Sequence, residues 1–183
     1  MKVYLTFLLL LLGSAASAQQ TPFNFSPLPL SPTTNRAVYS AVVPVTDTTK
    51  DQLFSRAQQW VSQITPVYKA SIRQIHPETG ALQFRGRIKQ GQESFGFQLA
   101  VSVEDGSYTY QLDNITRTQP QNPREGKYSS PTPQTVPIEA LVYTRPRKSR
   151  DKKLTEVDTR LRAVLASLNL AMQGKPARLT TQL

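Results

Sequence analysis

The chain has 183 residues, with 22 Lys and Arg against 12 Asp and Glu, and its formal net charge at pH 7 is +10. It has no cysteine and one histidine, His76, which excludes disulfides, thiolate metal ligands, cysteine nucleophiles, a lipid-modified cysteine and a histidine metal cluster. We therefore expect no metal and no cofactor, and a domain held together by packing alone.

The first 18 residues have the pattern of a signal peptide. Lys2 precedes an apolar run from Tyr4 to Leu12, and Ala16-Ser17-Ala18 is the small-residue pattern after which signal peptidase cuts. A membrane anchor is the alternative, but this run is about half of the roughly 20 residues that span a bilayer. We expect an exported protein, periplasmic or secreted, that starts at Gln19 and is not an integral membrane protein after cleavage. The lack of cysteine favours a bacterial source.

Residues 19–36 contain four prolines and no sustained period, so we interpret them as an extended leader that contributes little to the core. A single domain over residues 37–176 should follow, and residues 177–183 should form a tail. The β-branched run from Val38 to Val45 predicts its first strand. Pro44 suggests that this strand lies at a sheet edge or contains a bulge.

Thr49-Lys50-Asp51-Gln52 fits a capping box and predicts the start of a helix. Pro66 should end that helix. Trp60 could stack on a ligand, but a tryptophan on an apolar helix face is more often a core anchor. The apolar stripe consists of residues spaced by three and four: Leu53, Phe54, Ala57, Trp60, Val61 and Ile64.

Four alternating strands should form an antiparallel meander after this helix. The first is predicted from Val67 to His76, and Asp105-Gly106 predicts a two-residue hairpin turn of the primed type before the last. An apolar face on one side only is typical of an antiparallel sheet covered by helices on that side. The first strand should have Tyr68, Ala70 and Ile72 on one side and Lys69, Ser71 and Arg73 on the other. In the next three strands, the inward residues are Leu82, Phe84, Gly86 and Ile88, then Phe95, Phe97, Leu99, Val101 and Val103, then Tyr108, Tyr110 and Leu112.

A second helix is predicted from helically spaced apolar residues between Leu154 and Met172, with Gly174 and Pro176 as its stop. Residues 119–149 form a long proline-rich connector, mostly extended, in which Pro137 to Tyr143 is either a short helix or an edge strand. The fold class is therefore α+β. We expect an antiparallel sheet of about five strands in β-α-β-β-β-β-α order, with two helices packed on one face.

This order resembles a known family. The stretch Lys50-Asp51-Gln52-Leu53-Phe54, followed by Arg56-Ala57 and Trp60, is similar to a pattern in domain of unknown function 4468, a family of exported bacterial proteins with a TBP-like fold. The similarity covers residues 38–117. It implies a TBP-like fold, and it implies no catalytic residue, because the family has no established activity.

Basic residues are concentrated in the C-terminal third. Residues 117–183 hold 13 Lys and Arg against 5 Asp and Glu, whereas residues 19–116 hold 8 against 7. Such a run attracts polyanions, although a solvated loop without a partner is the alternative. The densest segment is a candidate binding site: Arg145, Arg147, Lys148, Arg150, Lys152 and Lys153.

The outward face of the sheet is a second candidate binding surface, for phosphorylated glycans, lipid headgroups or an acidic protein. Its alternative is ordinary solubilisation, since exposed cations on strands deter edge aggregation. We expect no specific DNA recognition, because no aromatic wedge lies among these cations and an exported protein does not meet chromosomal DNA. The cations are Lys69, Arg73, Arg85, Arg87 and Lys89.

No catalytic constellation stands out. His76 precedes Pro77 in a predicted turn, Ser94 lacks the spacing of a nucleophile elbow, and the few carboxylates define no glycosidase pair. The hypothesis is a non-enzymatic exported binding or adaptor domain whose partner is an acidic protein or an anionic envelope polymer. A structural envelope component without a dedicated ligand is the alternative, and a hydrolase ranks third.

Overall fold

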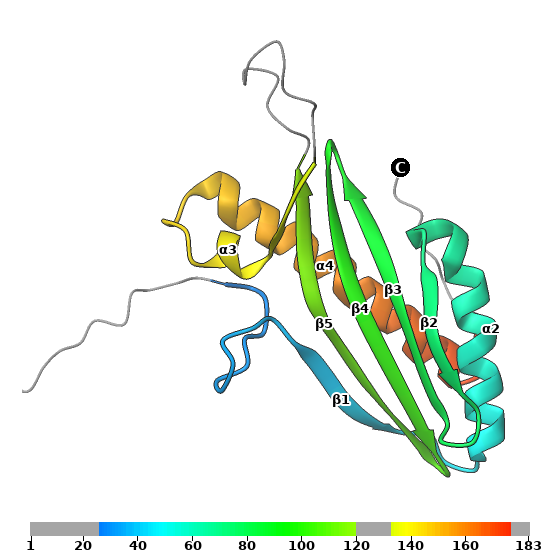
Figure 1. Cartoon of the computed structure of the whole chain (residues 1–183). Coiled ribbons are helices and arrows are strands. Elements are labelled where there is room, and N and C mark those ends of the chain that lie inside the picture. Colours follow the sequence, from blue (N-terminus) through cyan, green and yellow to red (C-terminus); the bar gives the residue numbers. More distant parts are fainter. Residues whose placement is uncertain (1–25, 120–132, 177–183) are drawn as a thin grey trace, which may run out of the picture.

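A six-stranded antiparallel sheet organises the molecule (Figure 1). The computed structural model describes residues 26–119 and 133–176. The strand order is β1-β5-β4-β3-β2, and β6 pairs with the far part of β5, beyond the stretch that pairs with β1. The strands are β1 (Tyr39–Pro44), β2 (Ser71–His76), β3 (Ala81–Gln90), β4 (Glu93–Glu104), β5 (Ser107–Gln119) and β6 (Gln134–Pro137).

Two long helices lie on one face of this sheet and leave the other face open (Figure 1). They are α2 (Lys50–Tyr68) and α4 (Lys148–Met172), and a short helix, α3 (Glu139–Val142), precedes α4. The predicted α+β class, the meander and the pair of covering helices are confirmed. The segment from Pro137 to Tyr143 was predicted to be either a short helix or an edge strand. It contains both, since it begins at the last residue of β6 and continues into α3. Residues 120–132 of the connector lie outside the described residues.

Strict alternation along β3 and β4 builds the core. Every second residue is buried against the helices, and its neighbours face the open side. The alternation predicted for the first meander strand was wrong within β2, an edge strand whose residues are all exposed, and Ile72 is 48% exposed. Trp60 is 1% exposed, its ring meets Phe84 edge to face at 5.5 Å, and its indole N–H donates to the hydroxyl of Ser167 on α4 at 3.1 Å. The prediction that Trp60 anchors the core is confirmed.

Helix α2 begins as predicted and ends later. The Thr49 capping box is present, but the helix continues through Pro66 to Tyr68, so the expected stop at Pro66 and the strand start at Val67 were wrong. Pro66 is exposed, and its missing N–H costs the helix one bond on its solvent side. Tyr68 is half-buried and packs edge to face on Phe97, at 6.4 Å between ring centroids. Tertiary packing of the last turn thus outweighs the proline.

The N-terminal leader is better packed than expected. Within its described part, Leu28 is 2% exposed and belongs to the core, and an isolated bridge joins Leu30 to Ala37. The expectation that the leader adds little to the core was therefore wrong for these residues. The predicted signal peptide at 1–18 and the tail at 177–183 lie outside the described residues. Of the helices in the described ranges, none has the length and apolar character needed to cross a membrane.

Two local features of β5 differ from simple alternation. The Asp105-Gly106 hairpin is present, but only Gly106 has a positive φ, so the turn is not of the primed type, which needs a positive φ at Asp105. Farther along, a register shift occurs around Asn114, whose φ is 49°. Beyond this bulge, Ile115 enters the core and Arg117 reaches an ion pair with Glu93.

Candidate anion-binding groove

The open face of the sheet carries a groove of about 520 Å³ over the first half of β2, the middle of β3 and the first half of β4. We call it the basic groove. Its charged walls are Lys69, Arg73, Arg85 and Arg87, and Thr116 and Thr135 line it from the β5 and β6 side. The structure therefore brings four of the five cations predicted for the outward face into one site.

Each cation reaches the groove for a local reason. Arg85 and Arg87 occupy outward positions of β3, between buried neighbours. Arg73 lies where the pairing of β2 with β3 changes register. Lys69 was expected inside a strand but is the C-cap of α2, with a left-handed backbone whose N–H donates to the Thr65 carbonyl. Lys89 is exposed at the next outward position of β3 but does not line the groove.

The floor of the groove is formed by a residue without a side chain. Gly96 on β4 pairs with Arg87 on one side and with Thr116 on the other. A Cβ on Gly96 would lie 2.7 Å from the Thr116 hydroxyl oxygen. The glycine thus keeps the groove open at its centre, where an anion could approach the strand backbone.

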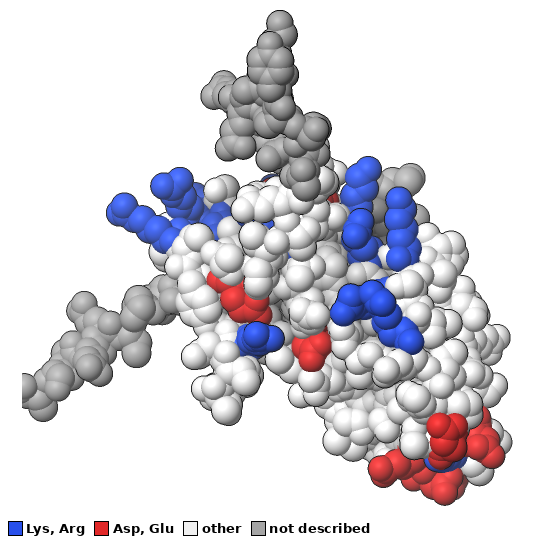
Figure 2. All heavy atoms as spheres, viewed as in Figure 1, with Lys and Arg blue, Asp and Glu red and all other residues white. Residues whose placement is uncertain are grey.

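Among the described residues, the charges in the groove have no acidic partners. Within the described parts of the chain, none of the four cations forms an ion pair, and the one side-chain hydrogen bond among them runs from Arg85 Nε to Gln98 Oε1 at 3.4 Å. All four are exposed. Figure 2 shows this basic area at one end of the open face and acidic side chains at the other end, near the β4–β5 turn. Clustered like charges favour binding of an anion.

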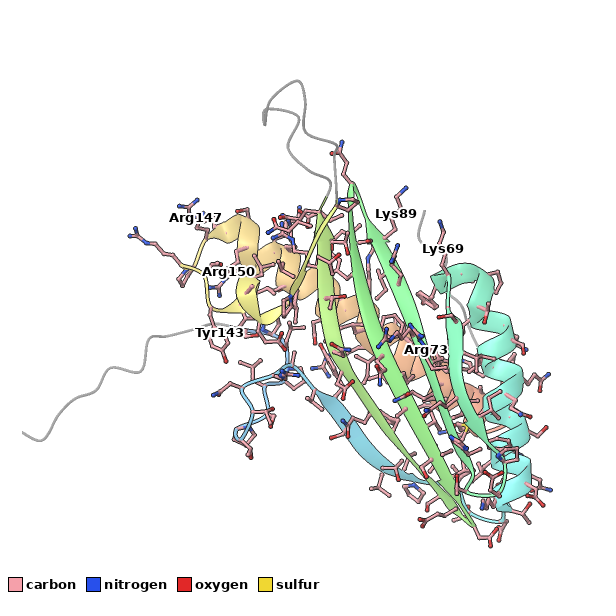
Figure 3. The ribbon with its side chains drawn as sticks, viewed as in Figure 1. Lys69, Arg73, Lys89, Tyr143, Arg147 and Arg150 are labelled. Atoms are coloured by element: carbon pink, nitrogen blue, oxygen red, sulfur yellow. The ribbon has the colours of Figure 1, made fainter. Side chains whose placement is uncertain are left out.

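The C-terminal basic segment forms a separate site. Figure 3 shows Arg147 and Arg150 near α3 and the start of α4, away from Lys69, Arg73 and Lys89. Here a cavity of about 450 Å³, which we call the α4 cavity, is lined by four of the six predicted cations and by Arg117. Lys148 and Lys152 are exposed but do not line it. The four are Arg145, Arg147, Arg150 and Lys153.

Arg150 is structural rather than part of an exposed run. It is 5% exposed, and its guanidinium donates to the carbonyls of Val142 and Thr144 and pairs with Asp151 at 2.8 Å. It thereby joins α3 to α4. The signal was present in the sequence, because Arg150 lies four residues before Leu154 on the same apolar stripe of α4.

Two further cations of the α4 cavity are neutralised by a carboxylate. Glu93 pairs with Arg117 at 2.6 Å and with Lys153 at 2.8 Å. The hydrogen bond from Arg117 lowers the pKa of Glu93 to about 2, although partial burial opposes the shift, and Lys153 contributes to it. The α4 cavity therefore carries its own counterions, whereas the basic groove does not.

The described residues offer little for catalysis. They contain no group of three or more His, Asp or Glu side chains that could hold a metal. His76 is the exposed last residue of β2, not a loop residue, and its nearest acid is Glu78 at 3.5 Å. Every phenylalanine in this part of the chain is buried, so none can act as a wedge on the open face.

Comparison with known proteins identifies the fold. Residues 39–118 match the family model described as a domain of unknown function (DUF4468) with TBP-like fold, which confirms the resemblance predicted from the sequence. No curated protein matches the chain.

Two solved structures are similar. A TBP-like protein from Parabacteroides distasonis has a TM-score of 0.62 at 13% identity, over 81% of this chain and 98% of that chain. A DUF4468 family protein from Bacteroides ovatus has a TM-score of 0.56 at 14% identity, over 83% and 93%. At these identities the likeness shows the fold alone.

Proposed function

We propose that this chain is an exported, non-enzymatic binding domain that holds an anionic ligand in the basic groove. The observation that carries the proposal is the set of four exposed cations around a glycine floor, which have no acidic partner in the part of the chain that the structure describes. If these cations served only solubility, nothing would require them to line the same groove. The rival proposal, a structural envelope component, gives no reason for a cation-lined groove that keeps its floor free of side chains.

Binding without catalysis is supported by the lining itself. The groove contains guanidinium, ammonium, hydroxyl and amide groups, but no carboxylate and no imidazole. General acid–base chemistry near neutral pH usually requires one of those two groups. The lining can therefore hold an anion but has no residue suited to move its protons.

Export is part of the proposal and has a direct test. If residues 1–18 are a signal peptide, the product recovered from outside the cytoplasm should begin at Gln19, as N-terminal sequencing would show. An uncleaved chain that stays with the membrane fraction would contradict export and cleavage.

The groove is tested with two variants that remove equal charge. Arg85→Gln/Arg87→Gln removes two groove cations, and Arg145→Gln/Arg147→Gln removes two from the α4 cavity, all four being exposed. Affinity for a fluorescent polyphosphate chain should fall about tenfold or more in the groove variant and much less in the control. The wild-type interaction should also weaken steeply with salt.

Stability should be nearly the same in both variants, within about ±0.5 kcal/mol per site. Equal losses of affinity would mean that only net charge matters, and a larger loss in the control would move the site to the α4 cavity. Either result would overturn the groove as the functional site.

A further inference from the structure

The basic groove is one end of a longer trough on the open face. It shares Gln98 and Asn114 with a neighbouring depression of about 700 Å³, which reaches Arg36 in the N-terminal segment. That depression shares Gln111 with a third, of about 320 Å³, which lies closer to the β4–β5 turn. The three depressions thus adjoin one another across the strands, and we call them together the trough.

The chemistry changes along this trough. At the β2 and β3 end it is cationic, as described above. At the centre it is lined by the amides of Gln98, Gln111 and Asn114, and hydroxyls of the N-terminal segment line its far end. The centre also contains a carboxylate, Asp113, which pairs in register with Gln98 and accepts a hydrogen bond from Gln111 Nε2 at 2.7 Å.

We propose that the trough binds a linear acidic polysaccharide, an inference that rests on the proposed function and specifies its ligand. A uniformly charged chain such as polyphosphate or a nucleic acid backbone would place negative charge against Asp113. Sugar hydroxyls can instead donate to Asp113, and the amides both donate and accept. A ligand with acidic groups at intervals and hydroxyls elsewhere therefore satisfies both the basic groove and the centre of the trough.

The geometry also requires an extended ligand. From β2 to β1 the trough crosses four strand spacings of about 4.8 Å each, which is about 19 Å in total. A single acidic sugar can occupy only one end. Affinity should therefore rise with chain length until the oligomer spans the trough, and then level off.

The experiment compares two probes of similar charge: oligogalacturonates of graded length, which carry carboxylates and hydroxyls, and polyphosphate, which lacks hydroxyl donors along its chain. Gln111→Ala removes an amide from the trough outside the basic groove. Gln59→Ala, at an exposed position on α2, is the matched control. Gln111→Ala should lower the affinity for long oligogalacturonate about fivefold and change polyphosphate binding less than twofold. Gln59→Ala should change neither.

The outcomes separate this inference from the proposed function. If polyphosphate or single-stranded DNA binds more tightly than oligogalacturonate of equal charge, or if Gln111→Ala affects all probes alike, the polysaccharide inference is overturned while the groove remains an anion site. A lack of dependence on oligogalacturonate length would also overturn it. If Arg85→Gln/Arg87→Gln weakens no probe, both proposals fall.

Discussion

The two faces of the sheet are built from the same strands and have opposite properties. Two glycines on neighbouring strands illustrate the difference: Gly86 on β3 belongs to the covered face, and Gly96 on β4 belongs to the open face. A Cβ on Gly86 would fall 2.4 Å from the ring of Phe97, whereas a Cβ on Gly96 would meet one hydroxyl at 2.7 Å. The covered face is filled by core side chains, and the open face leaves space.

This difference follows from the two-residue period of a strand. Residues that stabilise the fold and residues that line the groove alternate along β3, so either set can be changed with little direct effect on the other. Mutations on the covered face should therefore act on stability, and mutations on the open face should act on binding. The following predictions test that separation.

The largest effect is expected at Trp60. Trp60→Ala removes a side chain that packs on Phe84 and donates to Ser167, so the free energy of unfolding should fall by about 3–5 kcal/mol. Urea denaturation measures the loss. The fraction that remains folded should still bind polyphosphate normally. Lost binding with an unchanged stability would instead make Trp60 a ligand contact.

Gly86→Ala should come next. The added methyl group would displace the Phe97 ring, which is packed edge to face against Phe84 and Tyr68. Overpacking of this kind costs about 1–3 kcal/mol. Thermal unfolding of the variant measures the cost. The double variant Gly86→Ala/Phe97→Leu should recover part of it if the ring is the obstacle, and no recovery would contradict this explanation.

A pH-dependent effect is expected at Glu93. Its pKa is lowered from 4.5 to about 2 in the folded state, so its pairing stabilises the protein at pH values above the unfolded pKa. That stabilisation is lost as the pH falls from about 5 toward 2. The stability difference between wild type and Glu93→Gln should therefore shrink over this range, as urea titrations at several pH values would show. A constant difference would contradict the ion pairs with Arg117 and Lys153.

The sequence predicts the covered face better than the open one. Period-two alternation in β3 and β4 and the capping box at Thr49 are local signals, and the structure confirms them. The continuation of α2 past Pro66 depends on packing of Tyr68 against a distant strand. Local patterns carry no information on such contacts.

The candidate site could also be predicted only as far as local sequence patterns reach. Outward cations on β3 could be identified from alternation, but the sequence does not show that they lack acidic partners. Arg150 and Lys153 were grouped with exposed cations, although one is buried and the other pairs with Glu93, which is 60 positions away. Gln111 is an outward residue of β5, but Arg36 joins the trough only because the N-terminal segment lies beside β5.

The smallest effect on stability, and the sharpest contrast with Gly86, is expected at Gly96. Its added Cβ would meet Thr116 Oγ1, at the end of a side chain that can rotate, and Gly96 does not have a positive φ. Loss of unfolded-state entropy stabilises Gly→Ala changes by about 0.4–1 kcal/mol where the backbone permits them. The close contact with Thr116 destabilises the variant and the entropy effect stabilises it, so the stability of Gly96→Ala should stay within about 1 kcal/mol of wild type.

Binding should respond differently, because the new methyl group would occupy the floor of the basic groove. Polyphosphate affinity, measured by fluorescence titration, should fall clearly in Gly96→Ala and much less in Gly86→Ala, whose methyl group would meet the Phe97 ring of the core, at temperatures where both are folded. If Gly96→Ala binds as wild type does, the floor of the groove is not where the anion lies. If it unfolds as readily as Gly86→Ala, the two faces are not separable at this point of the sheet.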